Sequence, residues 1–278
     1  MRGTRTGVYV GYQIPGMYSV YQQEVQLDSG KSRIESSRHA SGVSKNLYAN
    51  RLSFIFDFKG PSFMVDTACS SSLLAFDIAV SDLRLGRCDM AIVATTQINL
   101  QPFTNFQAQH EKVNSSDGIS KVWDKDADGF VRAETVQCIL LEKKSHAKRI
   151  YATVIHSKSN IDGYKKKGGF FPSKEAQQIL MEETYIEAGI DPNEIDYVEA
   201  HGTGTKVGDP EEAEALANAY CKNREGNLLI GLLKSNIGHG EGTSGLAAIT
   251  KTIISFENKC IPANLNLKTI KPEIAKFC

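Results

Sequence analysis

The chain has 278 residues, of which 41% are hydrophobic and 23% charged, enough for one large domain or two modest ones with a sizeable core. Lysine and arginine together number 32, as do aspartate and glutamate, so the formal net charge is zero. This balance gives no support to a nucleic-acid surface or an anionic membrane as the main partner. The short basic run at Lys165–Lys167 is more typical of a solvated loop.

No apolar run reaches the roughly 18 residues that a membrane helix needs. The start, MRGTRTGVYVGYQ, lacks the apolar stretch of a signal peptide. The six cysteines (69, 88, 138, 221, 260 and 278) are scattered without a CxxC pair, which argues against a disulfide framework or a zinc site. We therefore expect a reduced, cytoplasmic location with no membrane span and no bound metal.

Predicted strands and helices alternate along the chain, because short apolar runs bounded by turn residues alternate with apolar residues at helical spacing. A polar stretch without clear periodicity follows the first strand, to about residue 50. In chain order we expect a strand at 6–11, a strand at 63–66, a buried helix at 71–85 ended by Gly86, a strand at 90–94, a strand at 150–155, a helix at 174–188 ended by Gly189, a strand at 197–200, a helix at 210–220 with Asp209 as its N-cap, a strand at 228–233 and a helix at 244–256. This alternation predicts an α/β fold with a largely parallel sheet, in two halves that meet near residues 145–150.

Cys69 stands in the run VDTACSSSLL, where a predicted strand turns into an apolar helix. The positive end of a helix dipole stabilises a thiolate by about 0.3–1 kcal/mol, or ~2 kcal/mol when partly buried. This stabilisation is too small to ionise most of the thiol at neutral pH. A nearby histidine would have to supply the remaining stabilisation of the thiolate. A free cysteine is also often a small buried core residue, and the spacing alone leaves both interpretations open.

Two histidines lie in glycine-rich turns after apolar runs, His201 in VEAHGTGT and His239 in KSNIGHGEG. Neighbouring glycines let the backbone approach a ligand closely. The first turn does not match a dinucleotide-binding GxGxxG pattern, because its third glycine comes one residue late at Gly208. A thiol and two imidazoles at strand-to-helix turns form a candidate nucleophile site, although either histidine alone is as well explained by a structural role.

The run DKDADG, from Asp124 to Gly129, opens like a calcium-binding EF-hand loop. The twelfth position of such a loop needs a glutamate that binds the ion with both oxygens. Here that position is Thr135, and the glutamate comes one place early at Glu134. We therefore interpret the run as an acidic surface turn rather than a calcium site.

Taken together, the motifs resemble the β-ketoacyl synthase (ketosynthase) family, most closely the ketosynthase domain of animal-type fatty acid synthases and related polyketide synthases. The matching segments are DTACSSSLLA at 66–75, EAHGTGTKVGDP at 199–210, KSNIGH at 234–239 and DKDADGFVRAE at 124–134. The likeness extends over almost the whole chain, from LSFIFDFKGPS to IPANLN and PEI.

The resemblance implies a role for each matching residue. Cys69 would be the nucleophile that takes an acyl group from an acyl carrier protein. His201 and His239 would donate hydrogen bonds to the enolate formed when malonyl, held on the carrier's phosphopantetheine arm, loses CO2. Lys234 would support the histidines electrostatically. Thr203 and Thr205 would bind the pantetheine arm.

The resemblance also implies an α/β thiolase-like fold, with two similar βαβ-rich halves in an α/β/α/β/α layering and the active site between them. Residues 1–147 would form the half with the nucleophile, and residues 148–278 the half with both histidine motifs. The expected activity is that of a 3-oxoacyl synthase type of acyltransferase in fatty acid or polyketide biosynthesis. The expected partners are an acyl carrier protein, a second copy of the chain and other domains of a multifunctional synthase, with no cofactor bound by the chain itself.

Relative to the family, the chain starts after the first strand and ends before a glycine- and phenylalanine-rich loop, so we expect a domain truncated at both ends. The main alternative is therefore a catalytically inactive fragment with a structural or dimerisation role. The cysteine and both histidines favour the enzyme.

Overall fold

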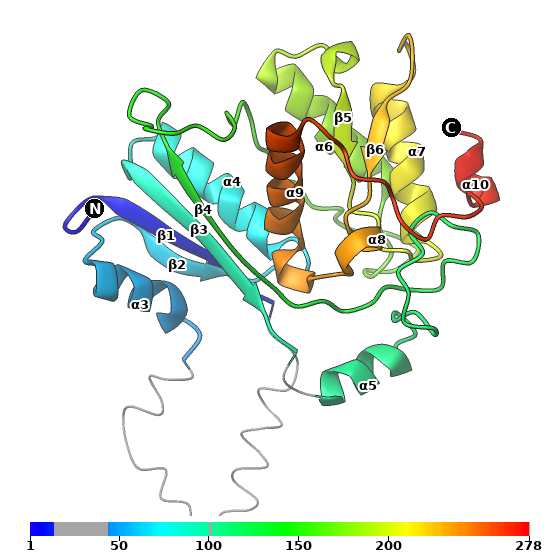
Figure 1. Ribbon diagram of the computed structural model, residues 1–278, viewed down its shortest axis with the longest axis horizontal. Helices are drawn as coiled ribbons and strands as arrows, with labels where there is room; N and C mark the ends of the chain where they lie inside the picture. The colour runs from blue at the N-terminus through cyan, green and yellow to red at the C-terminus, as the bar shows by residue number, and fades with distance from the viewer. Residues whose placement is uncertain (14–43, 100–101, 278) are drawn as a thin grey trace, which may run out of the picture. The chain divides into compact units, whose positions relative to one another are not determined.

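The computed structural model describes residues 1–13, 44–99 and 102–277 (Figure 1). The chain forms two compact units, and each draws on separated stretches of the sequence. The first unit comprises residues 1–107, 134–150 and 240–247, and the second comprises residues 108–133, 151–239 and 248–278. Most of the polar stretch expected before residue 50 lies outside the described residues.

A four-stranded sheet in the order β2-β1-β3-β4 forms the centre of the first unit. The central strand β1 (Thr6–Gly11) pairs in parallel with β2 (Ser62–Val65) and with β3 (Met90–Gln97). Strand β4 (Thr135–Glu142) pairs antiparallel to β3. The three strands predicted in this region are confirmed, with β3 three residues longer than expected, whereas β4 is an additional strand that the sequence analysis missed.

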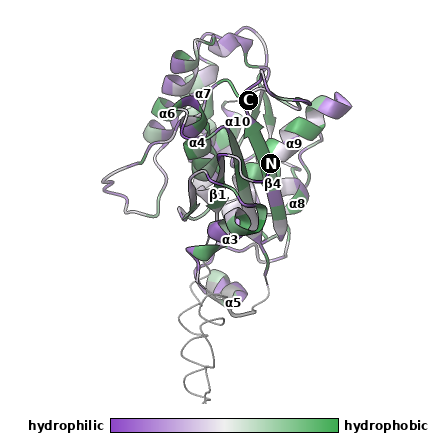
Figure 2. Cartoon of the chain, turned by 90° about the vertical axis from the view of Figure 1, so that its left-hand side faces the viewer, coloured by the Kyte–Doolittle hydropathy of each residue, from purple (hydrophilic) through white to green (hydrophobic). Residues whose placement is uncertain are grey.

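The two faces of this sheet are covered by different helices, because side chains alternate along a strand. Val8 and Val10 of β1 point to one face, where they pack with Ala49 of helix α3 (Leu47–Phe56). Tyr9 points to the other face, where its hydroxyl donates to Asp82 of helix α4 (Ser71–Arg84). In Figure 2 strand β4 is coloured largely hydrophobic.

The second unit is built around the parallel pair β5 (Tyr197–Glu199) and β6 (Leu229–Gly231). Helix α6 (Lys174–Ala188) packs on helix α7 (Gly208–Tyr220), and α10 (Pro272–Ala275) packs on α7 as well. The buried core residues of this unit are Val122, Trp123, Ala200, Ala213, Leu216, Leu232 and Ile274. The predicted helix at 174–188 is confirmed at both ends. The predicted strands at 197–200 and 228–233 and the predicted helices at 210–220 and 244–256 are confirmed as well, with no end shifted by more than two residues.

The remaining elements are short, except for two helices that cross from one unit to the other. Helix α5 (Pro102–His110) follows β3, and helix α9 (Ser244–Asn258) follows the second histidine turn. The others are α8 (Lys234–Ile237) and the 3-10 turns η1 (Pro192–Glu194) and η2 (Glu241–Thr243).

Two local predictions were wrong. Residues 150–155 form no strand, since among the described residues no neighbouring strand pairs with them and most of their side chains are exposed. Asp209 is not the N-cap of α7, which begins one residue earlier at Gly208 after the N-cap Val207. The Asp209 carboxylate instead serves the histidine turn described below.

Close contact between β1 and the start of α4 leaves no room for a side chain at Gly11. A Cβ atom there would lie 2.6 Å from the Cα of Ser72 and 2.7 Å from its nitrogen. Because backbone cannot move aside as a flexible side chain can, the tight packing holds the helix start against the end of the strand.

We predict that Gly11→Ala lowers the free energy of unfolding by about 1–3 kcal/mol, the usual cost of overpacking a filled interior. The matched control is Gly169→Ala, since nothing lies within 4 Å of a Cβ at that position. Urea denaturation of both variants checks the prediction, and equal stability of the two would contradict it.

Candidate functional site

Cys69 lies in a tight turn between β2 and α4. Ala68, the residue before it, has a left-handed backbone conformation with φ of 55°, which is uncommon for a residue with a Cβ. The helix begins at Ser71 with Ser70 as its N-cap, so Cys69 stands just before the helix and not within its first turn. Strand, strained turn and helix together form the arrangement that presents a nucleophile in other enzymes.

Hydroxyl groups from the serines after the cysteine hold this turn closed. The Ser71 hydroxyl accepts from the Thr67 amide at 2.8 Å and donates to the Ala68 carbonyl at 2.6 Å. The Ser70 hydroxyl bonds the Thr67 carbonyl at 2.8 Å. From elsewhere in the same unit, Ser244 donates its hydroxyl to the Cys69 carbonyl at 3.1 Å. The backbone of Cys69 is thus restrained on both sides, while its side chain is only half-buried.

In the second unit, His201 follows the end of β5 and opens the glycine-rich turn. The backbone amides of His201 and Gly202 donate to the two carboxylate oxygens of Glu212, at 2.6 Å and 2.8 Å. Gly204 is required at φ of +78°, and a Cβ there would lie 2.9 Å from the Gly129 carbonyl oxygen. The turn therefore takes its shape from the first residues of α7.

A second buried carboxylate completes this support. Asp209 accepts hydrogen bonds from the amides of Gly204 and Thr205 with one oxygen and from the amide of Trp123 with the other, at 3.0, 3.3 and 2.9 Å. Burial raises the pKa of both Asp209 and Glu212, while the amides that donate to them favour the charged form. Two buried acids therefore fix the turn by binding its backbone.

Lys234 lies against His201. Its ammonium donates to the His201 carbonyl oxygen and lies 3.3 Å from the ring nitrogen Nδ1. Lys234 is 95% buried (5% exposed), although it carries a charge. An ammonium at this distance favours the tautomer in which Nδ1 accepts and Nε2 carries the proton, so the free Nε2–H becomes a hydrogen-bond donor.

His239 meets His201 edge-to-face, with ring centroids 5.6 Å apart and an interplanar angle of 87°. The ring of Phe130 packs on its other side with a centroid distance of 4.8 Å. The backbone of His239 is bonded on both sides, since its amide donates to Val131 and its carbonyl accepts from Ala133. These contacts leave His239 1% exposed and fix its ring.

Both imidazoles are held in the neutral form. The charge of Lys234, followed by burial, lowers the pKa of His201 to about 3. The His201 side chain is exposed to solvent, so the nearby ammonium and not burial is the main cause. Burial, followed by the charge of Lys234, lowers the pKa of His239 well below its usual value. At neutral pH each imidazole therefore carries one ring N–H group. That group can donate a hydrogen bond to a developing negative charge.

Thr203 and Thr205 lie in the same turn as His201. Their hydroxyl oxygens are 3.0 Å apart, and the Thr205 hydroxyl also accepts from the amide of Gly208 at 3.2 Å. The structure therefore brings together five of the six predicted site residues in the second unit, while Cys69 belongs to the first unit.

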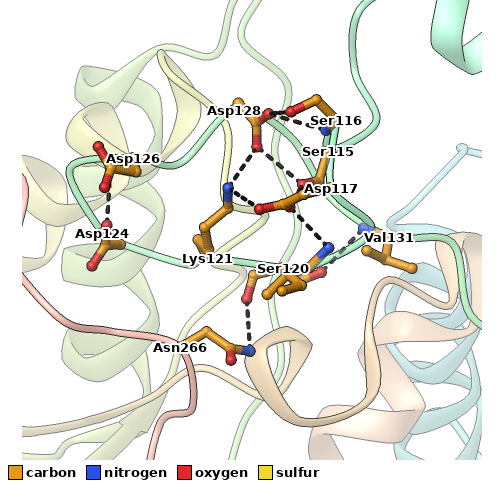
Figure 3. Close-up of polar contacts among 11 residues, drawn as sticks. Ser115, Ser116, Asp117, Ser120, Lys121, Asp124, Asp126, Asp128, Val131 and Asn266 are labelled. Carbon is orange, nitrogen blue, oxygen red and sulfur yellow. Dashed lines mark hydrogen bonds and ion pairs between the residues drawn. The ribbon is translucent and has the colours of Figure 1, made fainter.

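The DKDADG segment is a turn of the second unit whose tip, Lys125 and Asp126, is exposed, whereas Asp124 and Asp128 pack inward. Its interpretation as an acidic surface turn is therefore correct for the tip and wrong for these two aspartates. Asp124 is 2% exposed and accepts from the amides of Lys268 and Thr269 at 2.7 and 2.8 Å. Asp128 accepts hydrogen bonds from Ser115 and Ser116 and lies 3.5 Å from the ammonium of Lys121 (Figure 3). Its carboxylate is thus occupied by protein donors.

Hydrogen bonds also set the charge of this segment. Burial acts to raise the pKa of Asp128, but the bonds from Ser116 and Ser115 and the charge of Lys121 outweigh it and lower the pKa.

Across the part of the chain that the structure describes, no group of three or more His, Cys, Asp and Glu side chains is arranged to hold a metal ion. Among those same residues, no helix is both long and apolar enough to cross a bilayer.

Two family models match adjacent parts of the chain. Residues 1–147 match the N-terminal domain of beta-ketoacyl synthase, and residues 151–268 match its C-terminal domain. The chain belongs to the β-ketoacyl synthase family. Residues 148–150 lie between the two matches, next to the predicted division at residues 147 and 148. The extent of each half as a folded domain stays a prediction.

Similar curated proteins include a fatty acid synthase and several polyketide synthases. The fatty acid synthase of the goose Anser anser anser is 45% identical over 258 residues, which cover 93% of this chain and 71% of that sequence. The highly reducing polyketide synthase gloL of Glarea lozoyensis is 38% identical over 277 residues, covering 98% of this chain. The ketosynthase chain spans only 10% of the length of that polyketide synthase.

Solved ketosynthases share the fold. The ketosynthase from module 6 of the bacillaene synthase from Bacillus subtilis 168 matches 98% of this chain with a TM-score of 0.87 and 32% identity. An oxazolomycin ketosynthase domain from Streptomyces albus JA3453 matches equally well, with a TM-score of 0.87 and 35% identity. The chain covers 45% and 48% of those two structures. The predicted α/β, thiolase-like fold class is thereby confirmed.

The residues that support the candidate site were not predicted from the sequence. Glu212 was detectable in principle, because it shares a buried face of α7 with Ala213 and Leu216 at helical spacing, where an acid is out of place. Ser71 and Ser244 gave no such signal, because serine is ordinary at a helix start. Their roles depend on which segments meet in the fold.

We predict that Lys234→Met raises the pKa of His201 from about 3 toward its ordinary value of 6.5, because the ammonium that opposes imidazole protonation is gone. NMR titration of the imidazole signals measures the change. Lys174→Met, which breaks the Lys174–Glu214 ion pair, is the matched control and should leave His201 unaltered. A His201 signal that stays neutral in Lys234→Met over the whole folded pH range would contradict the assigned cause.

Proposed function

We propose that this chain catalyses a decarboxylative condensation, as a β-ketoacyl-[acyl carrier protein] synthase of the acyltransferase class in fatty acid or polyketide biosynthesis. Family membership supports the reaction class. The observation that carries the proposal is the contact between two neutral imidazoles, His201 and His239, beside the buried ammonium of Lys234. This set suits a reaction that passes through an enolate.

In the first step the thiolate of Cys69 attacks the thioester carbonyl of an acyl group on the carrier. A new thioester to Cys69 forms, the bond to the phosphopantetheine sulfur breaks, and the carrier leaves as a free thiol after taking up a proton. The left-handed turn at Ala68 and the hydroxyls that close it support this role, because they hold the backbone of Cys69 in one conformation.

In the second step malonyl on a carrier loses CO2, and the electrons of the broken carbon–carbon bond form an enolate. The Nε2–H groups of His201 and His239 donate to its oxygen. Lys234 keeps His201 in the donating tautomer, as its contact with Nδ1 indicates. The enolate carbon then attacks the acyl-Cys69 carbonyl, a β-ketoacyl product forms on the carrier, and the Cys69 thiolate leaves.

The proposed partners follow from these steps. An acyl carrier protein supplies both substrates on its phosphopantetheine arm, and the hydroxyls of Thr203 and Thr205 bind the amides of that arm. The pair lies in the same turn as His201 and carries polar groups 3.0 Å apart. We further propose that the chain works beside other domains of a synthase and pairs with a second copy of itself. The proposed location is the cytoplasm.

We predict that an acyl thioester labels the purified protein at Cys69 and that Cys69→Ala abolishes the label. Intact-protein mass spectrometry followed by peptide mapping measures it. The matched control is Cys260→Ala, which removes an exposed cysteine and should leave labelling unchanged. Persistent labelling of the Cys69→Ala variant would remove Cys69 from the mechanism, and an unlabelled wild-type protein would favour the inactive, structural alternative.

We also predict that His201→Ala or His239→Ala slows malonyl decarboxylation by about 10²–10³-fold, the usual loss for one oxyanion donor, while the acylation of Cys69 changes little. Release of CO2 and mass spectrometry measure the two steps separately. His146→Ala, at an exposed histidine, is the control. Equal losses in both steps would argue against the donor role.

A further inference from the structure

A buried ion pair in the second unit has no role in the steps described so far. Lys251 of α9 lies 2.7 Å from a carboxylate oxygen of Glu199, the last residue of β5. Their side chains are 6% and 7% exposed. Buried ion pairs contribute little net stability compared with well-packed apolar residues of similar volume. Stability alone therefore does not account for this pair.

The second oxygen of Glu199 connects the pair to the histidine site. It accepts a hydrogen bond from the Leu233 amide at 2.7 Å. Leu233 directly precedes Lys234 and is the N-cap of α8. Glu199 itself lies two residues before His201. One carboxylate therefore links the end of the strand that leads to His201 with the start of the helix that carries Lys234.

The chain leaves space for this carboxylate. Gly231 is opposite Glu199 in the β5–β6 register. A Cβ at Gly231 would overlap the Tyr197 hydroxyl and the Glu199 carboxylate. The Tyr197 hydroxyl donates to the same Glu199 oxygen that faces Lys251. Burial and this hydrogen bond raise the pKa of Tyr197, so the phenol keeps its proton and remains a donor.

We propose that Glu199 and Lys251 are positioning residues for the Lys234–His201 contact. Lys251 and Tyr197 restrain one oxygen of Glu199, the other oxygen fixes the backbone before Lys234, and the ammonium of Lys234 is thereby held 3.3 Å from Nδ1 of His201. The inference deepens the proposed function and rests on it for its catalytic consequence. Its geometric part concerns only the second unit.

The pKa of His201 can be measured directly, and it depends on the charged and titratable groups around this residue. They are Lys234, Glu212, which binds the His201 amide, and His239. If the Glu199–Lys251 pair is lost, the Lys234 ammonium moves away from Nδ1. His201 then gains a proton more easily, so its pKa rises, whereas a side chain that only stabilised the fold would change stability without this shift.

The test compares the double variant Glu199→Gln/Lys251→Met, which leaves no unpaired buried charge, with Gly231→Ala, which crowds the carboxylate without removing a charge. Lys251→Arg is the conservative variant expected to rescue, and Lys174→Met is the surface control. NMR titration of His201 and thermal unfolding are measured on each. We expect His201 to titrate at higher pH in the double variant and in Gly231→Ala. In Lys251→Arg and Lys174→Met we expect it to titrate as in the wild type.

Catalysis is measured on the same proteins. We expect malonyl decarboxylation to fall by about 10–100-fold in the double variant, the scale of loss caused by small misplacements, with Cys69 acylation unchanged. A folded double variant with the wild-type His201 pKa and the wild-type ratio of the two rates would overturn the inference. If wild-type protein fails to acylate Cys69, the proposed function fails, and the NMR result still decides whether Glu199 and Lys251 position Lys234.

Discussion

The site in the second unit depends on one buried cation. Lys234 is almost fully buried, and its ammonium is placed between the carbonyl oxygen and Nδ1 of His201. Removing a charge from water costs several kcal/mol unless the protein supplies acceptors, about the scale of a whole domain's net stability. The carbonyl, the ring nitrogen and the charge of nearby Glu212 supply that compensation. The cation in turn keeps the imidazole of His201 neutral and fixes its orientation. A histidine in water would be protonated at acidic pH and free to rotate.

Motif residues were predictable from the sequence because each carries its own chemical signal. A cysteine before a helix start, and histidines among glycines after apolar runs, indicate candidate reactive groups in turns. These turns occur as expected at Cys69, His201 and His239, although His239 itself is buried. The helices that follow were predictable too, since their apolar spacing is strong. By contrast, β4 was missed because it gains its pairing from β3, whose residues pair with it from Gln97 with Thr135 to Met90 with Glu142. Residues 150–155 have strand-like composition without such a pairing.

The partners of the supporting residues were not predictable, for the same reason. Glu212, Asp209 and Glu199 all bind backbone amides, at Gly202, Gly204 and Leu233 among others. An acid that binds an amide has no distinctive sequence context, because the partner is set by the fold. Only their burial distinguishes them. A carboxylate on an apolar helix face or at the end of a buried strand is costly, so its presence there indicates that amides or a cation meet it.

The turns at Cys69 and His201 use the same construction. Each follows the end of a parallel strand, contains a residue with positive φ, and directs backbone amides to a side chain on the next helix: Ser71 in the first unit and Glu212 in the second. Since the acceptor belongs to the helix, the turn that carries the candidate reactive residue is tied to that helix by hydrogen bonds. The packing of helix on sheet, as at Gly11, therefore sets the geometry of the reactive groups. This explains why side chains that never touch a substrate can still determine how a ketosynthase site works.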